Sequence, residues 1–352
     1  MTKKSRNNSI LIPKKQAKRK KRVASSIRPI FKTPDGDLFL GKCEEVLKSL
    51  KKKVGGKVQL ILTSPPFPLK RKKRYGNFTG KTYIDWLSGL APLFAELLTD
   101  DGSIVIELGN AWEPEQPVQS LLPLKSLLAF VENKKTNLKL CQEFICFNPA
   151  RLPSPAQWVT IERIRAKDSF TRLWWMAKSA RPAADNGRVL KEYSKAMKQL
   201  LARQSYNAGK RPSEHVISKN GFLKKHRGAI PPNVIVDDLR SIPSDLLIGA
   251  NTGSSEAYQI FCRDQGFDMH PARMPRFLAE FFIKFLTKPG DLVLDPFSGS
   301  NTVGAVAQEL GRRWISIEAR DEYAIASVAR FDSQTATSLM PKSGVAASTS
   351  QT

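Results

Sequence analysis

Residues 58–67 read Val-Gln-Leu-Ile-Leu-Thr-Ser-Pro-Pro-Phe, an apolar run that stops at two prolines. The run 58–62 is typical of a buried strand, and the prolines end it because they cannot donate hydrogen bonds to a sheet. A serine, two rigid carbonyls and an aromatic ring therefore gather at the carboxyl end of the strand. Ligands bind at that edge in open α/β sheets. The cluster suits a flat ring with an amino group, because it offers hydrogen-bond acceptors and a face for stacking.

A second strand pattern, with its own turn, lies near the end of the chain. Residues 292–295 (LVLD) are followed by the turn 296–301 (PFSGSN), and 302–310 then read as a helix. The next predicted strand, 313–318, closes on Glu318. This order of elements, in which a strand, a tight turn and a helix precede a strand that ends in a carboxylate, indicates a site for a nucleotide-like cofactor. The acid would accept hydrogen bonds from the ribose hydroxyls. The turn lacks the three-glycine dinucleotide fingerprint, which disfavours a pyrophosphate ligand.

Strand and helix patterns alternate through the rest of the chain. Strands are expected at 37–40, 103–108 and 140–147, and helices at 43–50, 83–98, 119–135 and 277–286. Strands separated by helices predict an α/β fold with a mostly parallel sheet and helices on both faces. Trp174 and Trp175 are interpreted as core residues.

The chain carries a strong excess of positive charge. Its 352 residues include 57 Lys or Arg and 32 Asp or Glu, which gives a net charge of +25. A protein this basic is expected to bind a polyanion, usually DNA or RNA. Residues 1–28 hold eleven Lys or Arg and no acid, so they are expected to form a disordered arm. Such an arm either grips phosphates or only adds solubility.

Composition disfavours metal sites and membrane insertion. The chain has four cysteines (Cys43, Cys141, Cys146, Cys262) and three histidines (His215, His226, His270). They show no spacing typical of metal ligands, so we expect no metal and a reducing compartment, the cytoplasm. The charged N-terminus has no apolar segment behind it, and no uncharged apolar run reaches the length of a membrane span.

Together these segments resemble the DNA amino-methyltransferases that use S-adenosylmethionine. Residues 63–67 (TSPPF) are similar to their catalytic motif, and 295–302 (DPFSGSNT) to their cofactor loop. The catalytic motif comes first, which is the permuted β-class order. The resemblance implies a Rossmann-like class I methyltransferase sheet. Serine at the first position of the motif points to the cytosine-N4 branch, because adenine-N6 enzymes usually carry Asp or Asn there.

Further segments resemble the PvuII-type cytosine-N4 methyltransferases in particular. These are residues 63–77, 148–155, 228–233 and 270–275. The resemblance spans roughly residues 36–331 and weakens between about 180 and 265.

The resemblance implies a role for each residue of the catalytic motif. Ser64 Oγ and the Pro65 carbonyl would accept hydrogen bonds from the target amino group, which makes its lone pair more available. Phe67 would stack on the base, and Pro66 would keep the loop rigid. The base must first be flipped out of the duplex, and the methyl group is then transferred directly.

The cofactor residues follow from the same resemblance. Contacts are expected from the cofactor loop and strand end (Asp295, Phe297, Ser298, Gly299, Ser300, Asn301, Glu318) and from the segment before the cofactor half (Pro271, Arg273). Glu318 would bind the ribose hydroxyls.

The resemblance also divides the chain into regions. They are a disordered basic arm (1–28), a catalytic half (29–180), a target-recognition region (181–268), a cofactor-binding half (269–331) and a flexible tail (332–352). DNA contacts are expected from the run after the catalytic motif (Lys70, Arg71, Lys72, Lys73, Arg74) and from the recognition region (Arg211, Lys224, Lys225).

Three alternatives remain open on the sequence. The target could be adenine N6, or RNA, and the chain could be an inactive DNA-binding protein of the same fold. A cytosine-C5 enzyme is excluded because it would need a cysteine after a proline, and none of the four cysteines follows one. The expected partners are double-stranded DNA and, without a stable complex, a restriction endonuclease. We expect a monomer associated with the nucleoid.

Overall fold

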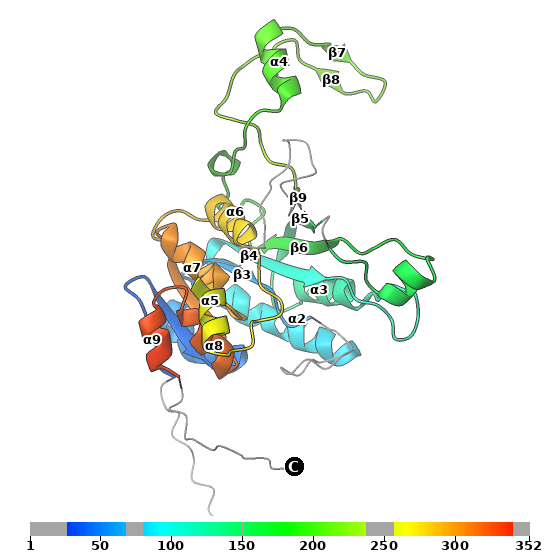
Figure 1. The fold of residues 1–352 in the computed structure, drawn as a ribbon. Helices are drawn as coiled ribbons and strands as arrows, with labels where there is room; N and C mark the ends of the chain where they lie inside the picture. Colours follow the sequence, from blue (N-terminus) through cyan, green and yellow to red (C-terminus); the bar gives the residue numbers. More distant parts are fainter. Residues whose placement is uncertain (1–26, 68–79, 149–150, 237–256, 341–352) are drawn as a thin grey trace, which may run out of the picture.

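A nine-stranded sheet organises the computed structural model, which describes residues 27–67, 80–148, 151–236 and 257–340 (Figure 1). The strand order is β1-β2-β11-β10-β3-β4-β6-β5-β9. The strands are β1 (Phe31–Lys32), β2 (Gly36–Leu40), β3 (Val58–Thr63), β4 (Leu98–Gly109), β5 (Lys139–Phe147), β6 (Phe170–Ala177), β9 (Val234–Val236), β10 (Leu292–Asp295) and β11 (Arg313–Glu318). The five central strands from β2 to β4 run parallel, whereas β6 is antiparallel to both β4 and β5.

Helices cover both faces of this sheet, so the α/β prediction is confirmed. They are α1 (Cys43–Val54), α2 (Gly80–Leu97), α3 (Leu122–Val131), α5 (Ala257–Asp264), α6 (Arg276–Leu286), α7 (Thr302–Glu309), α8 (Asp321–Val328) and α9 (Ser333–Ser338). One hydrophobic layer joins the sheet to α1, α2 and α3, and the other joins it to the helices from α5 to α9.

The central strand β3 shows why the sheet is buried on both faces. All six of its residues are buried. Leu60 and Leu62 pack in the layer of α6 and α7, whereas Ile61 between them packs in the layer of α1 and α2. Successive side chains of a strand point to opposite faces, so only a continuous apolar run satisfies both layers.

The predicted strands and helices are confirmed, with β6 as the main omission. Trp174 and Trp175 lie on this strand and are 7% and 8% exposed, which agrees with their interpretation as core residues. Strand β6 also places the indole of Trp175 to donate to Ser103 Oγ at 2.9 Å. Polar partners of this kind let an indole be buried.

Two boundaries differ from the predicted ones. Helix α5 falls in the predicted recognition region 181–268, yet it packs on α8 and its Tyr258 is fully buried. Helix α9 falls in the predicted flexible tail 332–352, where the Asp332 side chain caps its first turn and Ala336 is buried. Residues 1–26 of the predicted basic arm lie outside the described residues.

An extension stands apart from the sheet at the top of Figure 1. It holds α4 (Lys195–Arg203) and the hairpin of β7 (Gly209–Lys210) and β8 (Val216–Ile217). Helix α4 buries none of its own residues, so this part of the predicted recognition region contributes little to the core.

The described residues contain no helix long and apolar enough to cross a bilayer. They also contain no group of three or more His, Cys, Asp or Glu placed to hold a metal ion.

A candidate active site at the carboxyl edge of the sheet

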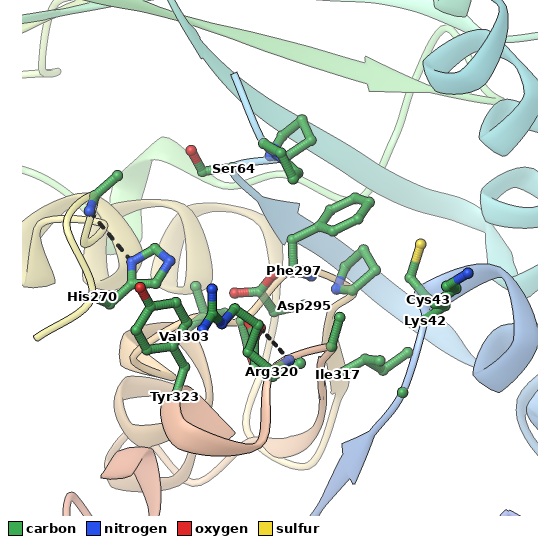
Figure 2. A pocket seen from close by; sticks show the side chains of 18 of the residues that line it. Lys42, Cys43, Ser64, His270, Asp295, Phe297, Val303, Ile317, Arg320 and Tyr323 are labelled. Atoms are coloured by element: carbon green, nitrogen blue, oxygen red, sulfur yellow. Dashed lines mark hydrogen bonds between the residues drawn. The ribbon is translucent and has the colours of Figure 1, made fainter. Parts of the chain in front are cut away.

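Three neighbouring parallel strands end beside a large pocket. They are β3, β10 and β11. The pocket has a volume of about 820 Å³ and is lined by the loop after β3, the turn after β10, the end of β11 and the start of α1. Figure 2 shows Ser64 and Cys43 on opposite sides of this hollow, with Asp295 between them.

Asp295 joins the end of β3 to the turn after β10. Its carboxyl group is 4% exposed, and Oδ1 accepts hydrogen bonds from Thr63 Oγ1 at 2.7 Å and from the Phe297 amide at 3.1 Å. Burial raises the pKa of Asp295 to about 7, although both hydrogen bonds oppose this shift. The bond to Thr63 fixes the residue directly before Ser64.

Glu318 holds the same turn from the next strand. Its carboxylate accepts from the Gly299 amide and from the Arg320 amide, both at 2.9 Å. Burial raises the pKa of Glu318, while these amides oppose the rise. A carboxylate has about four acceptor positions, so two backbone amides leave capacity for ligand hydroxyls.

Gly299 is required by the shape of the turn. Its φ is +50°, and an added Cβ would lie 2.9 Å from Cε1 of the His270 ring. Glycine alone tolerates both the left-handed backbone and this close approach.

An aromatic wall closes the side of the pocket next to α1. The rings of Trp86 and Phe297 lie 5.6 Å apart, and Tyr83 lies 5.5 Å from Trp86. The Trp86 indole donates to Glu44 Oε1 at 2.6 Å. Burial opposes ionisation of Glu44, but this bond and backbone hydrogen bonds still hold its pKa below the ordinary value. Such a wall, with an acceptor at its edge, fits a flat heterocycle.

Two buried polar atoms at the pocket have no partner among the described residues. They are Ser298 Oγ and the Tyr83 hydroxyl. Buried polar groups are normally hydrogen-bonded, so both atoms are available to a bound ligand.

A smaller pocket of about 340 Å³ adjoins the first and shares part of its lining. The shared residues are Ser64, Phe67, Ala272 and Met274. The catalytic motif therefore lies where the two pockets meet. A methyl donor in the larger pocket and an acceptor in the smaller one would both contact this motif.

Polar groups line the deep side of the smaller pocket. Glu107 on β4 is 8% exposed and accepts from Thr171 Oγ1 on β6 at 3.0 Å. Asn148 after β5 has a buried Oδ1 with no partner among the described residues. These groups suit the polar edge of a base.

The segment between the two pockets corrects the predicted place of two residues. His270 lines the larger pocket alone, whereas Pro271 and Arg273 line the smaller one. Ala272 and Met274 contact both. Pro271 and Arg273 were expected to bind the cofactor, whereas the structure places them in the lining of the smaller pocket.

The other predicted cofactor residues divide into two groups. Asp295, Phe297, Ser298, Ser300 and Glu318 line the larger pocket. Gly299 and Asn301 lie outside its lining. Asn301 is fully buried, caps α7 by accepting from the Gly304 amide, and accepts from Ser316 Oγ at 2.6 Å. Both residues therefore shape the turn.

The predicted DNA contacts are partly described. The run Lys70, Arg71, Lys72, Lys73 and Arg74 lies outside the described residues. Lys224 and Lys225 are exposed on the extension, and Arg211 donates to the Asn207 carbonyl at 2.7 Å.

Sequence reasoning missed Glu107, Trp86 and Glu44. Glu107 was detectable as a charged residue near the carboxyl end of a predicted apolar strand. Trp86 and Glu44 come from different helices, and no motif connects them.

Comparisons with known proteins agree with this geometry. The chain is 39% identical over 306 residues to the type II methyltransferase M.PvuII of Proteus hauseri, covering 86% of each protein. The solved PvuII DNA methyltransferase (cytosine-N4-specific) superposes with a TM-score of 0.68 at 33% identity, covering 89% of this chain and 94% of that one. A shorter match, 44% identical over 66 residues, joins 19% of this chain to 22% of the DNA adenine methyltransferase YhdJ of Escherichia coli (strain K12).

The matched family confirms the resemblance drawn from the motifs. Residues 58–328 match the N6_N4_Mtase model, a DNA methylase. This range runs from the first residue of β3 to the last residue of α8. It includes the whole lining of the smaller pocket and all of the larger pocket's lining except residues between 41 and 48. The chain belongs to the N6_N4_Mtase family of DNA methylases.

Proposed function

We propose that this methylase transfers a methyl group from S-adenosylmethionine to the exocyclic N4 of cytosine in double-stranded DNA. The observation that carries the proposal is the position of Ser64 and Phe67 in the lining of both pockets. A donor and an acceptor that meet at one motif need no covalent enzyme intermediate.

The larger pocket fits the cofactor. S-adenosylmethionine supplies a methyl group on a positively charged sulfonium. Glu318 would accept from the ribose hydroxyls, and the aromatic wall of Trp86 and Phe297 would hold the adenine. Ser298 Oγ, which is buried without a described partner, would bind the polar methionine end. The two buried acids, Asp295 and Glu318, favour a cationic ligand electrostatically.

The smaller pocket fits the flipped base. Ser64 Oγ and the Pro65 carbonyl would accept from the target amino group, and Phe67 would stack on the ring. A base amino nitrogen is a weak nucleophile because its lone pair is delocalised into the ring. Acceptors that favour a pyramidal nitrogen make the lone pair more available to the methyl group.

Cytosine is preferred over adenine on two grounds. Serine stands at the first position of the motif. M.PvuII, which is 39% identical over 86% of the chain, has a solved structure described as cytosine-N4-specific. The match to an adenine methyltransferase covers only 19% of the chain, so adenine N6 is the second candidate.

The biological setting follows by analogy with that relative. We place the protein as the modification partner of a restriction endonuclease, acting as a monomer without a stable complex with the nuclease. A net charge of +25 favours association with the nucleoid.

Nucleoside analysis tests the proposal. DNA is incubated with the protein and labelled S-adenosylmethionine, digested, and examined by mass spectrometry. We expect N4-methylcytosine. Detection of N6-methyladenine would mean that the target base is adenine and would leave the assignment of the fold and the site unchanged. The absence of any methylated deoxynucleoside would reject DNA methylation.

Ser64→Ala tests the role of the motif. We expect kcat to fall about 100-fold, because an acceptor for the reacting amino group is lost, while the Kd for S-adenosylmethionine stays nearly unchanged. The control is Ser88→Ala, on α2 outside both pocket linings. An equal loss of turnover and cofactor affinity would contradict the role given to Ser64.

A further inference from the structure

We infer that Ile161 and Ile164 form an apolar wedge that enters the base stack of the DNA beside the flipped base. This inference rests on the proposed function, because it needs DNA in the smaller pocket. The wedge belongs to the segment 151–169, which connects β5 to β6 and contains the helical turn η1 (Gln157–Ile161).

The strand register places this segment at the edge where the base pocket opens. Phe147, the last residue of β5, pairs with Phe170, the first residue of β6. Thr171 pairs with Gly109 at the end of β4, and β4 pairs with β3 up to Thr63. The segment therefore leaves and re-enters the sheet at the carboxyl edge, and Figure 1 shows its single helical turn extending beyond β6.

Both ends of the segment take part in the pocket itself. Asn148 and Arg151 on one side, and Phe170 and Thr171 on the other, line the smaller pocket. The Asp168 carboxylate accepts from the Asn110 amide at 2.8 Å, which ties the segment to another lining residue. Whatever enters this pocket passes close to the segment.

The turn that carries the isoleucines is held in one shape. The Glu162 amide donates to the Gln157 carbonyl at 2.8 Å, and the Ile164 amide donates to the Trp158 carbonyl at 3.0 Å. The Gln157 side chain also donates to Glu162 Oε1 at 2.7 Å. Arg163 has a φ of +57°, which turns the chain back after the helical turn. Isoleucine is stiff at χ1, so these side chains lose little rotamer freedom when they enter a base step.

A second contact fixes the segment to the loop after β4. The Arg165 guanidinium lies 3.8 Å above the ring of Trp112. The same group also donates to the Pro117 carbonyl. Arg165 thus connects the wedge to the strand that carries Glu107.

The isoleucines lack the burial that such side chains usually have. Ile161 is 68% exposed and Ile164 is 58% exposed, and Leu152 in the same segment is 79% exposed. Single exposed apolar residues are normal, but three in one segment beside a binding pocket indicate a contact surface. Water gives these side chains no favourable contact, whereas the faces of stacked bases do.

The charges around the wedge select DNA as the occupant. Arg163 lies between the two isoleucines in the chain, Arg165 and Lys167 follow Ile164, and Glu162 is the one acid among residues 161–167. An opened base step has this pattern, with apolar base faces inside and phosphates on either side. Apolar side chains that enter a step replace part of the stacking that flipping removes.

The experiment compares two substrates. Both are duplexes that carry the target sequence, which is first mapped by sequencing DNA that the protein has methylated. In one the target base is paired, and in the other it faces an abasic site, which removes the need to break the pair. The variant is the double substitution Ile161→Ala and Ile164→Ala. The control is Leu140→Ala, an exposed apolar residue at the other end of β5.

We expect the double variant to lower kcat/KM about tenfold on the paired duplex and to stay within about twofold of the wild type on the abasic duplex. Leu140→Ala should match the wild type on both, and Ile161→Leu with Ile164→Leu should restore activity because apolar bulk is kept. No loss on the paired duplex, or the same loss on both duplexes, would overturn the wedge. Failure of the wild type on both duplexes would instead reject the proposed function.

Discussion

At the scale of single residues, Asp295 is the buried acid that joins β3 to the turn after β10. It is buried, accepts from Thr63 Oγ1, and has its pKa raised to about 7 by burial. An ionised carboxylate is costly to bury unless a positive charge compensates it. The sulfonium and ammonium groups of S-adenosylmethionine supply such charges.

Cofactor affinity should therefore depend on pH. Cationic groups favour ionised Asp295, so binding releases the proton that the free protein holds below pH 7. Affinity then falls as the pH decreases through 7, by about tenfold between pH 8 and pH 6. Calorimetry at the two pH values measures this change. Asp295→Asn should bind more weakly at pH 8 and lose most of the pH dependence, and an unchanged dependence in this variant would assign the titration to another group.

Gly299 is the residue whose replacement gives the sharpest steric test. Gly299→Ala adds both backbone strain at φ +50° and a collision with the His270 ring. Gly311→Ala is the matched control, because its φ is +70° and nothing lies within 4 Å of an added Cβ. We expect the control to lose about 1 kcal/mol of unfolding free energy and Gly299→Ala to lose more, together with cofactor affinity. If thermal unfolding shows equal losses of unfolding free energy in the two variants, the His270 ring moves aside.

The position of the motif residues could be predicted from the sequence, whereas the pocket that Pro271 and Arg273 line could not. Ser64 to Phe67 follow a strand that ends at prolines, so their edge was determined by local rules. Pro271 and Arg273 lie in an irregular segment, where the side that each residue faces depends on the packing of His270 against Gly299. Such a contact between distant parts of the chain leaves no local pattern.

At the scale of elements, α5 supports the cofactor turn from outside. The Tyr258 hydroxyl accepts from the His270 amide at 2.9 Å, and the Arg330 guanidinium lies 5.0 Å from the Tyr258 ring. Arg330 in turn donates to the Ser300 carbonyl at 2.6 Å. A helix that falls in the predicted recognition region therefore supports two segments that line the larger pocket.

Tyr258→Phe tests this support. The ring and its packing remain, but the partly buried His270 amide loses its acceptor, which costs about 1 kcal/mol. We expect a lower melting temperature and several-fold weaker cofactor binding. The control is Ile260→Ala on the outer side of α5, where the side chain is 37% exposed. If cofactor binding is unchanged in Tyr258→Phe, α5 serves stability alone.

Long apolar strands were easier to predict than α5 and β6. Strand β3 is apolar throughout because both of its faces are covered, and that pattern is visible without tertiary information. Strand β6 begins Phe-Thr-Arg, with Arg172 bonded to Glu143 on β5, so a polar start concealed a central strand. Helix α5 has eight residues, too few for a clear helical period.

At the scale of the whole molecule, two anchors attach the extension to the methylase sheet. Arg188 donates to the Thr287 carbonyl at 2.7 Å and to the Phe285 carbonyl at 3.0 Å, at the end of α6. On the return, β9 pairs with β5. The basic surface of the extension is thus attached to elements that also form the core.

The basic arm makes a prediction about DNA binding by the full chain. Removing residues 1–28 takes away eleven cations and no anions. We expect weaker binding at low salt and a shallower slope of log K against log salt, by about 0.9 for each phosphate that the arm neutralises in the full chain. Titrations at several salt concentrations measure the slope. An identical slope in the truncated protein would make the arm a solubilising segment.

The segment from His270 to Pro275 has a consequence for inhibition. Its Ala272 and Met274 line both pockets, as Ser64 and Phe67 do. A single compound could therefore occupy the two adjoining pockets, with an adenosine unit joined by a short linker to a cytosine analogue. Binding both halves at once would cost the entropy of association only once, so such a bisubstrate compound should bind far more tightly than either half. Its preferred base would also report which base the smaller pocket accepts.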